Sequence, residues 1–189
     1  DDTGGAAWDL CGFRAANRRL EWPHAPAAIG TGACTIACVI RIGDQPGWQI
    51  PLGHGWGTSN SNSPWFFMCD NDAREIHFVM QFTETNGAPL EVRAGHRIPP
   101  ADFVGWHVIA GAYSPRRNEL ALYVDGARVA TADVPAGARR LDNPAPLTIG
   151  SLAGGNLPFL GYVRDVLAFN RALSAREIVP PAAPAAPAP

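Results

Sequence analysis

A short stretch between Gly47 and Trp65 gathers side chains of the kinds that recognise sugars. Indole rings can stack on the apolar faces of sugar rings, while amide and imidazole groups hydrogen-bond to hydroxyl groups. Glycine, serine, asparagine and proline surround these side chains, a composition typical of loops, where binding residues are displayed. The predicted ligand site consists of Trp48, His54, Trp56, Asn60, Asn62 and Trp65.

An alternative assigns part of this group to the hydrophobic core. Trp48 and Trp65 flank predicted strands, and both would then be buried rather than available to a ligand. Trp56 stands between Gly55 and Gly57, which favours an exposed loop position. Trp56 is therefore the best single candidate for a ligand contact.

A second group of side chains could hold a metal ion. Asp70, Asn71 and Asp72 form an acidic cluster in a predicted loop, and such hard oxygen ligands suit Ca²⁺. The alternative is a polar turn, because Asp and Asn favour turns for their own backbone hydrogen bonding. The sequence leaves both interpretations open.

Composition excludes several classes of function. All 15 basic residues are arginine, so mechanisms that need a lysine, such as Schiff-base chemistry or a phosphate-binding loop lysine, are excluded. The formal net charge of −2 argues against nucleic-acid binding, which usually shows a basic excess. No apolar run approaches the roughly 20 residues that span a bilayer, so we predict no membrane insertion.

The four cysteines allow up to two disulfides. Cys34 and Cys38 would lie about 13 Å apart on one face of an extended strand, too far to bridge each other. We expect both to be small buried core residues. A bridge between Cys11 and Cys69 stays open.

Alternating apolar and polar residues predict strands along most of the chain. Turn residues separate the segments, a pattern that indicates an antiparallel sandwich or barrel. The expected strands are 34–42, 75–82, 106–113, 119–124, 127–134, 146–150 and 161–169. Asp125-Gly126 is the strongest hairpin signal. Ser174–Ile178 suggests one helical turn with a capping box, and Pro180–Pro189, which contains only Pro and Ala, suggests an extended linker or terminal arm.

Five ordered signatures in the C-terminal half carry a family resemblance. They are Trp106–Tyr113 (WHVIAGAY), Leu120–Gly126 (LALYVDG), Leu147–Gly150 (LTIG), Phe159–Val166 (FLGYVRDV) and Asn170–Ile178 (NRALSAREI). This series resembles the laminin-G-like domains of the concanavalin-A-like lectin/glucanase superfamily. The resemblance implies an all-β jelly roll of two antiparallel sheets over residues 1–179, followed by the arm 180–189. Within the signatures, Trp106 and Tyr113 are expected to be core aromatics.

Enzyme activity on this fold would need groups that the sequence does not assemble. Hydrolases of the superfamily carry a motif similar to E-x-D-x-x-E on one strand, which puts several acids on one face. The glutamates of this sequence are isolated from one another. Alginate-lyase-like members use Arg, Gln, His and Tyr; Arg74, His77, Gln81 and Tyr113 are the right types, but their order differs. Pentraxin-like calcium sites need a second acidic loop, and the corresponding segment, 151–157, has no carboxylate. We therefore expect no catalytic residue and no double calcium site.

The resemblance favours a non-catalytic recognition or adhesion module. A glycan or cell-surface polysaccharide is the expected ligand, with neighbouring subunits as further partners through the Pro/Ala arm. We expect the domain on a secreted protein, a cell surface or a phage particle, outside the cytoplasm. The alternatives are a structural building block of a virion or fibre without a small ligand, and a polysaccharide lyase or hydrolase.

Overall fold

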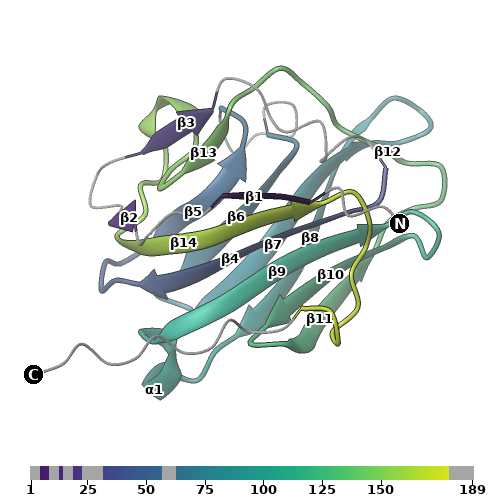
Figure 1. Cartoon of the computed structure of the whole chain (residues 1–189). Helices are drawn as coiled ribbons and strands as arrows, with labels where there is room; N and C mark the ends of the chain where they lie inside the picture. Colours follow the sequence, from purple (N-terminus) through teal and green to yellow (C-terminus); the bar gives the residue numbers. More distant parts are fainter. Residues whose placement is uncertain (1–4, 9–12, 15–18, 23–31, 57–62, 179–189) are drawn as a thin grey trace, which may run out of the picture.

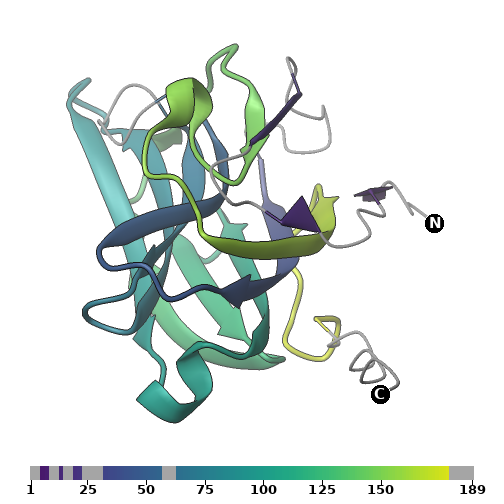
Figure 2. The ribbon, with the colours of Figure 1, turned by 90° about the vertical axis from the view of Figure 1, so that its left-hand side faces the viewer.

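A computed structural model describes residues 5–8, 13–14, 19–22, 32–56 and 63–178. Two antiparallel sheets pack face to face (Figure 1 and Figure 2). The predicted jelly-roll sandwich is therefore confirmed. The strands that form it come from both halves of the chain, so the fold extends well beyond the five signatures.

Sheet A, as we name the first layer, pairs the C-terminal strand with an early one. Its described strands are β1 (Gly5–Trp8), β2 (Phe13–Arg14), β4 (Cys34–Ile42), β9 (Trp106–Ser114), β10 (Glu119–Val124), β11 (Ala127–Asp133) and β14 (Gly161–Phe169). Their order is β1, β14, β4, β9, β10 and β11, and β2 also pairs with β14. The last strand thus lies between β1 and β4.

Sheet B forms the second layer and contains several strands that the alternation rule missed. Its described strands are β3 (Leu20–Trp22), β5 (Trp48–His54), β6 (Trp65–Asp70), β7 (Glu75–Thr83), β8 (Pro89–Arg97), β12 (Arg139–Arg140) and β13 (Leu147–Ile149). Their order is β12, β7, β6, β5, β13 and β3. In addition, β8 pairs with β7 along the full length of both strands. A short helix, α1 (Pro100–Phe103), connects β8 to β9, and a 3₁₀ turn, η2 (Ala153–Gly155), precedes β14.

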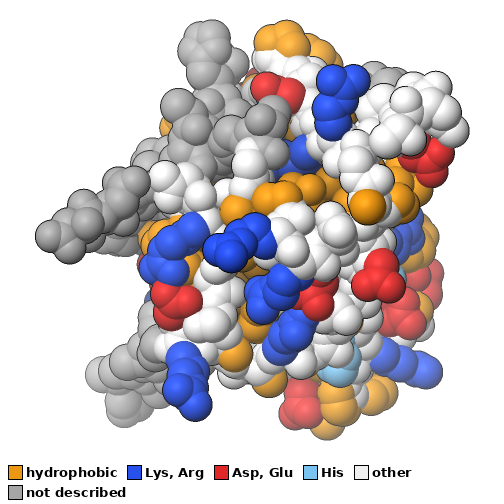
Figure 3. Space-filling view, turned by 90° about the vertical axis from the view of Figure 1, so that its right-hand side faces the viewer, with side chains coloured by type: hydrophobic (Ala, Val, Ile, Leu, Met, Phe, Trp, Pro, Cys, Tyr) orange, Lys and Arg blue, Asp and Glu red, His pale blue; other side chains and the backbone are white. Residues whose placement is uncertain are grey.

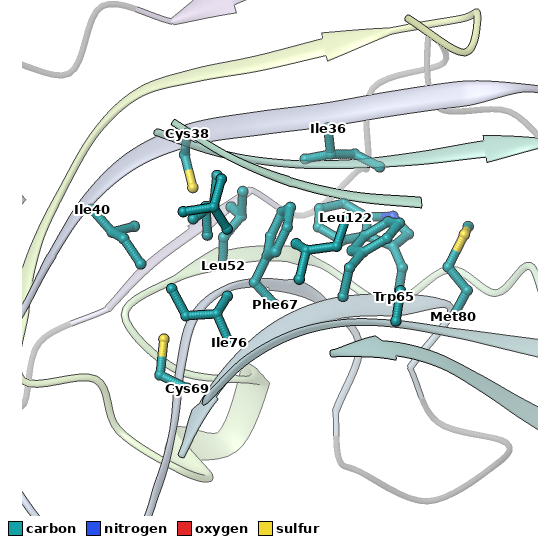
Figure 4. Close-up of a cluster of buried hydrophobic side chains, with 14 of the residues drawn as sticks. Ile36, Cys38, Ile40, Leu52, Trp65, Phe67, Cys69, Ile76, Met80 and Leu122 are labelled. Atoms are coloured by element: carbon teal, nitrogen blue, oxygen red, sulfur yellow. The ribbon is translucent and has the colours of Figure 1, made fainter. Parts of the chain in front are cut away.

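The main core lies between the two sheets (Figure 4). Side chains alternate across a strand, so every second residue of β4 and β7 points inward. The inward residues of these two strands are Cys34, Ile36, Cys38, Ile40, Ile42, Ile76, Phe78, Met80 and Phe82, all at most 2% exposed. This confirms the predicted inward faces of both strands. Burial of these side chains removes apolar surface from water and is the main stabilising term of the fold.

The cysteines behave mainly as core residues. Cys34 and Cys38 are buried free thiols, as predicted. Cys69 is also a buried free thiol, so the bridge to Cys11 that the sequence left open is not formed. Cys11 itself lies outside the described residues, as does the Pro180–Pro189 arm.

Two turn predictions are confirmed and one core prediction is wrong. Asp125 and Gly126 have φ of 52° and 81°, as a type I′ hairpin turn requires. The amides of Glu177 and Ile178 both donate to the carbonyl of Ser174, which makes the single helical turn expected there. Trp106, however, is 38% exposed, because it occupies an outward position at the start of β9.

Surface charges of opposite sign lie close together. Figure 3 shows basic and acidic side chains interspersed on one side of the molecule. Glu119, for example, pairs with both Arg117 and Arg128. Interspersed charges of this kind produce no strong single-sign field over that side. Among the described residues, no helix is long and apolar enough to cross a bilayer.

Candidate functional site

The outer face of sheet B brings together three side chains from three strands. Trp48 begins β5, His77 lies on β7 and Arg93 lies on β8. The ring centroids of Trp48 and His77 are 5.6 Å apart, and Cζ of Arg93 is 5.9 Å from the Trp48 centroid. Trp48 is 40% exposed, so its indole remains available to a ligand. We call these three residues the Trp48 cluster.

Carboxylates and an amide surround the Trp48 cluster. Oε2 of Glu75 lies 3.1 Å from Nε2 of His77. Glu91 links two neighbours: its Oε1 lies 2.6 Å from Nη2 of Arg93, and its Oε2 accepts a 2.7 Å hydrogen bond from Nε2 of Gln81. Glu91 thus pairs with the Arg93 guanidinium, and Glu75 lies beside the His77 imidazole. An exposed ring, a cation and carboxylate oxygens thus share one surface.

His77 is the buried member of the cluster. Its pKa is lowered, first by burial and then by the Arg93 charge, while Glu75 opposes the change. Nδ1 of the ring is buried with no hydrogen-bond partner among the described residues. Gly95 makes room for the ring, because a Cβ at that position would lie 2.4 Å from Nδ1.

The described residues of the predicted ligand site, Trp48, His54, Trp56 and Trp65, do not form one site. Trp65 is fully buried among core side chains of both sheets (Figure 4), so the prediction for this residue is wrong and the core alternative holds. His54 is 4% exposed and packs edge-on against Trp65, with ring centroids 6.2 Å apart. His54 and Trp65 are directly opposite each other on β5 and β6, so their side chains point to the same, inner face of sheet B.

Trp48 and Trp56 lie at opposite ends of β5. Six residue steps of about 3.3 Å put the first and last residues of this strand about 20 Å apart, and Trp56 follows after Gly55. Trp56 is 47% exposed, and its carbonyl accepts a 3.0 Å hydrogen bond from Asn156 Nδ2. Asn60 and Asn62 lie outside the described residues. Trp48 and Trp56 are therefore separate candidates for a ligand contact.

The acidic cluster at residues 70–72 has the geometry of a polar turn. Oδ1 of Asp70 accepts hydrogen bonds from the amides of Asp72 and Ala73, at 3.0 and 3.1 Å. Nδ2 of Asn71 donates to the carbonyl of Gly43 at 2.8 Å. Within the described part of the chain, no group of three or more His, Cys, Asp or Glu side chains could hold a metal ion. These contacts favour the turn interpretation over calcium binding.

The four lyase-type residues are not assembled. His77 and Gln81 do share the outer face of β7, but both are buried rather than solvated. Tyr113 lies in the core between the sheets, where its ring contacts Phe82. The Arg74 guanidinium lies 5.3 Å from the Phe103 ring centroid. Sheet B thus lies between Tyr113 and the outward-facing His77 and Gln81, while Arg74 packs against Phe103 of α1.

The sequence interpretation missed Arg93 because it did not predict β8. The signal was present: Leu90, Val92 and Ala94 alternate with Glu91 and Arg93. That alternation puts the charged residues on the outer face, next to His77.

Comparison with known proteins places the fold in a superfamily. The family model of the concanavalin A-like lectin/glucanases superfamily matches residues 15–179. The chain belongs to this superfamily. No curated protein sequence matches the chain.

Solved structures similar to this superfamily member show the same sandwich. The CBM40 domain of the Ruminococcus gnavus IT-sialidase has a TM-score of 0.69 at 16% identity, covering 92% of this chain and 96% of that one. The botulinum neurotoxin serotype D ligand-binding domain, in complex with N-acetylneuraminic acid, has a TM-score of 0.64 at 12% identity, covering 88% and 40%. The Trypanosoma rangeli sialidase has a TM-score of 0.58 at 16% identity, covering 88% and 26%. The chain thus spans less than half of the neurotoxin and sialidase chains, and these likenesses concern the fold.

Proposed function

We propose that this chain is a non-catalytic glycan-binding domain and that the Trp48 cluster is its sugar site. The exposed indole of Trp48 offers a platform for the apolar face of a sugar ring. The Arg93 guanidinium can donate hydrogen bonds to hydroxyl or acidic groups at the edge of the same ring, and the nearby glutamates can accept them from hydroxyl groups. The juxtaposition of Trp48 and Arg93 carries the proposal.

The fold relatives support a glycan as the ligand class. The R. gnavus CBM40 domain has been solved bound to α2,6 and α2,3 sialyllactose, and the neurotoxin D domain with N-acetylneuraminic acid. Because identity is 16% or lower, these complexes suggest which probes to use first and do not locate a site in this chain. Sialylated glycans are the natural first probes.

The geometry favours binding over catalysis. A retaining glycosidase needs two carboxylates about 5 Å apart facing the scissile bond. In the Trp48 cluster each glutamate is already engaged: Glu75 contacts His77, and Glu91 contacts both Gln81 and Arg93. We therefore propose that the domain holds a glycan without cleaving it, on a secreted protein, a cell surface or a phage particle.

A glycan array on the purified chain tests the proposal. Sialylated, sulfated and neutral glycans would be probed with Ca²⁺ and again with a chelator. We expect selective binding in both conditions, since the contacts at residues 70–72 are those of a turn. Binding that disappears with the chelator would instead assign a metal to that turn. A blank array on folded protein would contradict glycan binding and favour the structural alternative.

Two matched substitutions locate the site. We expect Trp48→Ala to weaken binding of the best glycan at least about 10-fold, because stacking on an aromatic ring is lost. Trp56→Ala removes an indole of similar exposure at the other end of β5, and we expect it to leave binding unchanged. The reverse pattern would move the site to the loop that follows β5.

A further inference from the structure

The outer face of sheet A carries an apolar pocket of about 160 Å³. Its lining comes from β4, β9 and β14 and from the C-terminal turn that follows β14. The apolar residues that the argument uses are Ala37, Val39, Val108, Phe169 and Ile178. This pocket lies on the opposite side of the sandwich from the Trp48 cluster, so a sugar bound there leaves it free.

An aromatic pair continues from one edge of this pocket. Trp106 is paired with Arg41 on β4, which in turn is paired with Tyr162 on β14. The Trp106 and Tyr162 ring centroids lie 6.0 Å apart. Val108, in the pocket lining, is the next residue on the same face of β9, about 7 Å along the strand from Trp106. The pocket and the aromatic pair therefore adjoin on the outer face of sheet A, where Arg41 and Arg164 also lie. We call this surface the sheet A groove.

Arg164 contributes to the same surface. Its Cζ lies 5.0 Å from the Trp106 ring centroid. Its Nε lies 3.4 Å from Oδ2 of Asp165. Arg41 and Arg164 on this face are balanced by the carboxylates of Asp165 and Glu177 in the pocket lining. With charges of both signs present, the sheet A groove favours an uncharged occupant over an anionic one.

The chain itself supplies an uncharged segment at the end of this groove. Ile178 lines the pocket, and the chain continues from it through Val179 into Pro180–Pro189, which contains only Pro and Ala. Such a segment favours the polyproline II conformation, in which ten residues span about 31 Å. That length is several times the separation of Val108 and Trp106 along β9.

We propose that Pro180–Pro189 docks in the sheet A groove of its own chain as a polyproline II segment. Grooves lined by aromatic rings recognise this conformation because it is already extended and loses little entropy on binding. Attachment at Ile178 also gives the segment a high effective concentration at the groove. The segment thereby shields the exposed Trp106 ring. Docking is independent of the sugar site proposed above.

Indole nuclear magnetic resonance on the full chain tests this proposal. A tail variant carries four substitutions: Pro180→Gly, Pro181→Gly, Pro184→Gly and Pro187→Gly. We expect the indole signal of Trp106, assigned with Trp106→Phe, to shift in the tail variant, while the signal of Trp48 stays in place. A free peptide with the sequence of residues 180–189 should return the Trp106 signal towards its original position. The same peptide with glycine for proline should not.

Three results would overturn the proposal. An identical Trp106 signal in the original chain and the tail variant would show that the segment does not reach the groove. A second result is that the Trp106 signals of the original chain and the tail variant differ only at high protein concentration. Together with a dimer in sedimentation, that result would assign the docking to a second copy. A glycan that shifts Trp106 and leaves Trp48 unchanged would assign the groove to a sugar. Glycan binding at Trp48 is measured separately, so either proposal can fail alone.

Discussion

His107 ties the β10–β11 turn to the end of α1. Its Nδ1 lies 2.8 Å from Oδ2 of Asp125, and its Nε2 lies 2.9 Å from the carbonyl oxygen of Asp102. Oδ1 of Asp125 also accepts a 2.9 Å hydrogen bond from the amide of Val108. The backbone of Asp125 has a φ of 52°. One buried imidazole thus connects three segments that are separate in sequence.

We predict that His107→Ala lowers the free energy of unfolding by about 2–3 kcal/mol, because both hydrogen bonds and a buried ring are lost. His96→Ala changes a partly exposed histidine of β8 and should stay within about 0.5 kcal/mol. Urea unfolding of the two variants measures the difference. Equal stabilities would show that the His107 contacts contribute nothing.

Gly111 allows the two sheets to approach at Phe78. A Cβ on Gly111 would lie 2.2 Å from Cγ of Phe78, so Gly111→Ala must displace that ring. We expect a loss of about 1–3 kcal/mol in the free energy of unfolding, as is usual for overpacking. Gly32→Ala, where no atom lies within 4 Å of the new Cβ, is the matched control. Adding Phe78→Leu to Gly111→Ala should recover part of the loss; a further loss would argue against the steric explanation.

The core thiols should be unreactive in the folded chain. Burial raises the pKa of Cys34, Cys38 and Cys69, so little of the reactive thiolate forms near neutral pH. In a Cys11→Ser variant, we expect no thiol to react with a thiol reagent until urea unfolds the protein, and three to react afterwards. Rapid labelling without denaturant would contradict the packing of these residues.

Two buried histidines should make the fold sensitive to acid. Burial lowers the pKa of His54 and His77 below the ordinary value of 6.5, and the Arg93 charge lowers that of His77 further. The unfolded chain therefore binds these protons at a higher pH than the folded chain. The free energy of unfolding should decrease as pH falls from about 6.5 through the lowered pKa values, and these groups should have no effect above that range.

Urea unfolding between about pH 5 and pH 8 measures this dependence. The double variant His54→Gln, His77→Gln should show a smaller decrease on acidification than the original chain. His96→Gln, on the partly exposed histidine of β8, should leave the decrease unchanged. If the double variant kept the full decrease, other groups would have to account for the acid sensitivity.

Arg93 should distinguish acidic from neutral glycans if the Trp48 cluster binds sugar. Arg93→Gln removes the charged hydrogen bonds that a carboxylate or sulfate group would receive. We expect affinity for acidic glycans to drop about 10-fold or more, with a smaller effect on neutral glycans. Arg116→Gln, at an exposed turn, is the matched control. A uniform loss across all glycans would show that Arg93 supports the cluster and does not read charge.

Local rules were sufficient for an all-β sandwich or barrel and for several elements, and the jelly roll followed from the family resemblance. The alternation in β4 and β7 predicts their buried faces, since the side-chain period of a strand is two. Asp125-Gly126 predicts its turn from the positive φ values that the hairpin requires. These features depend on neighbouring residues only, so the sequence determined them by itself.

The candidate site depended on tertiary structure. Trp48 and Trp65 are alike in sequence context, but the register of β5 and β6 puts Trp65 inside and leaves Trp48 outside. Trp48, His77 and Arg93 come from three strands, and β7 brings the last two together through its pairing with β8. No local pattern encodes which strands become neighbours, because that choice depends on how two whole sheets bury their apolar faces against each other.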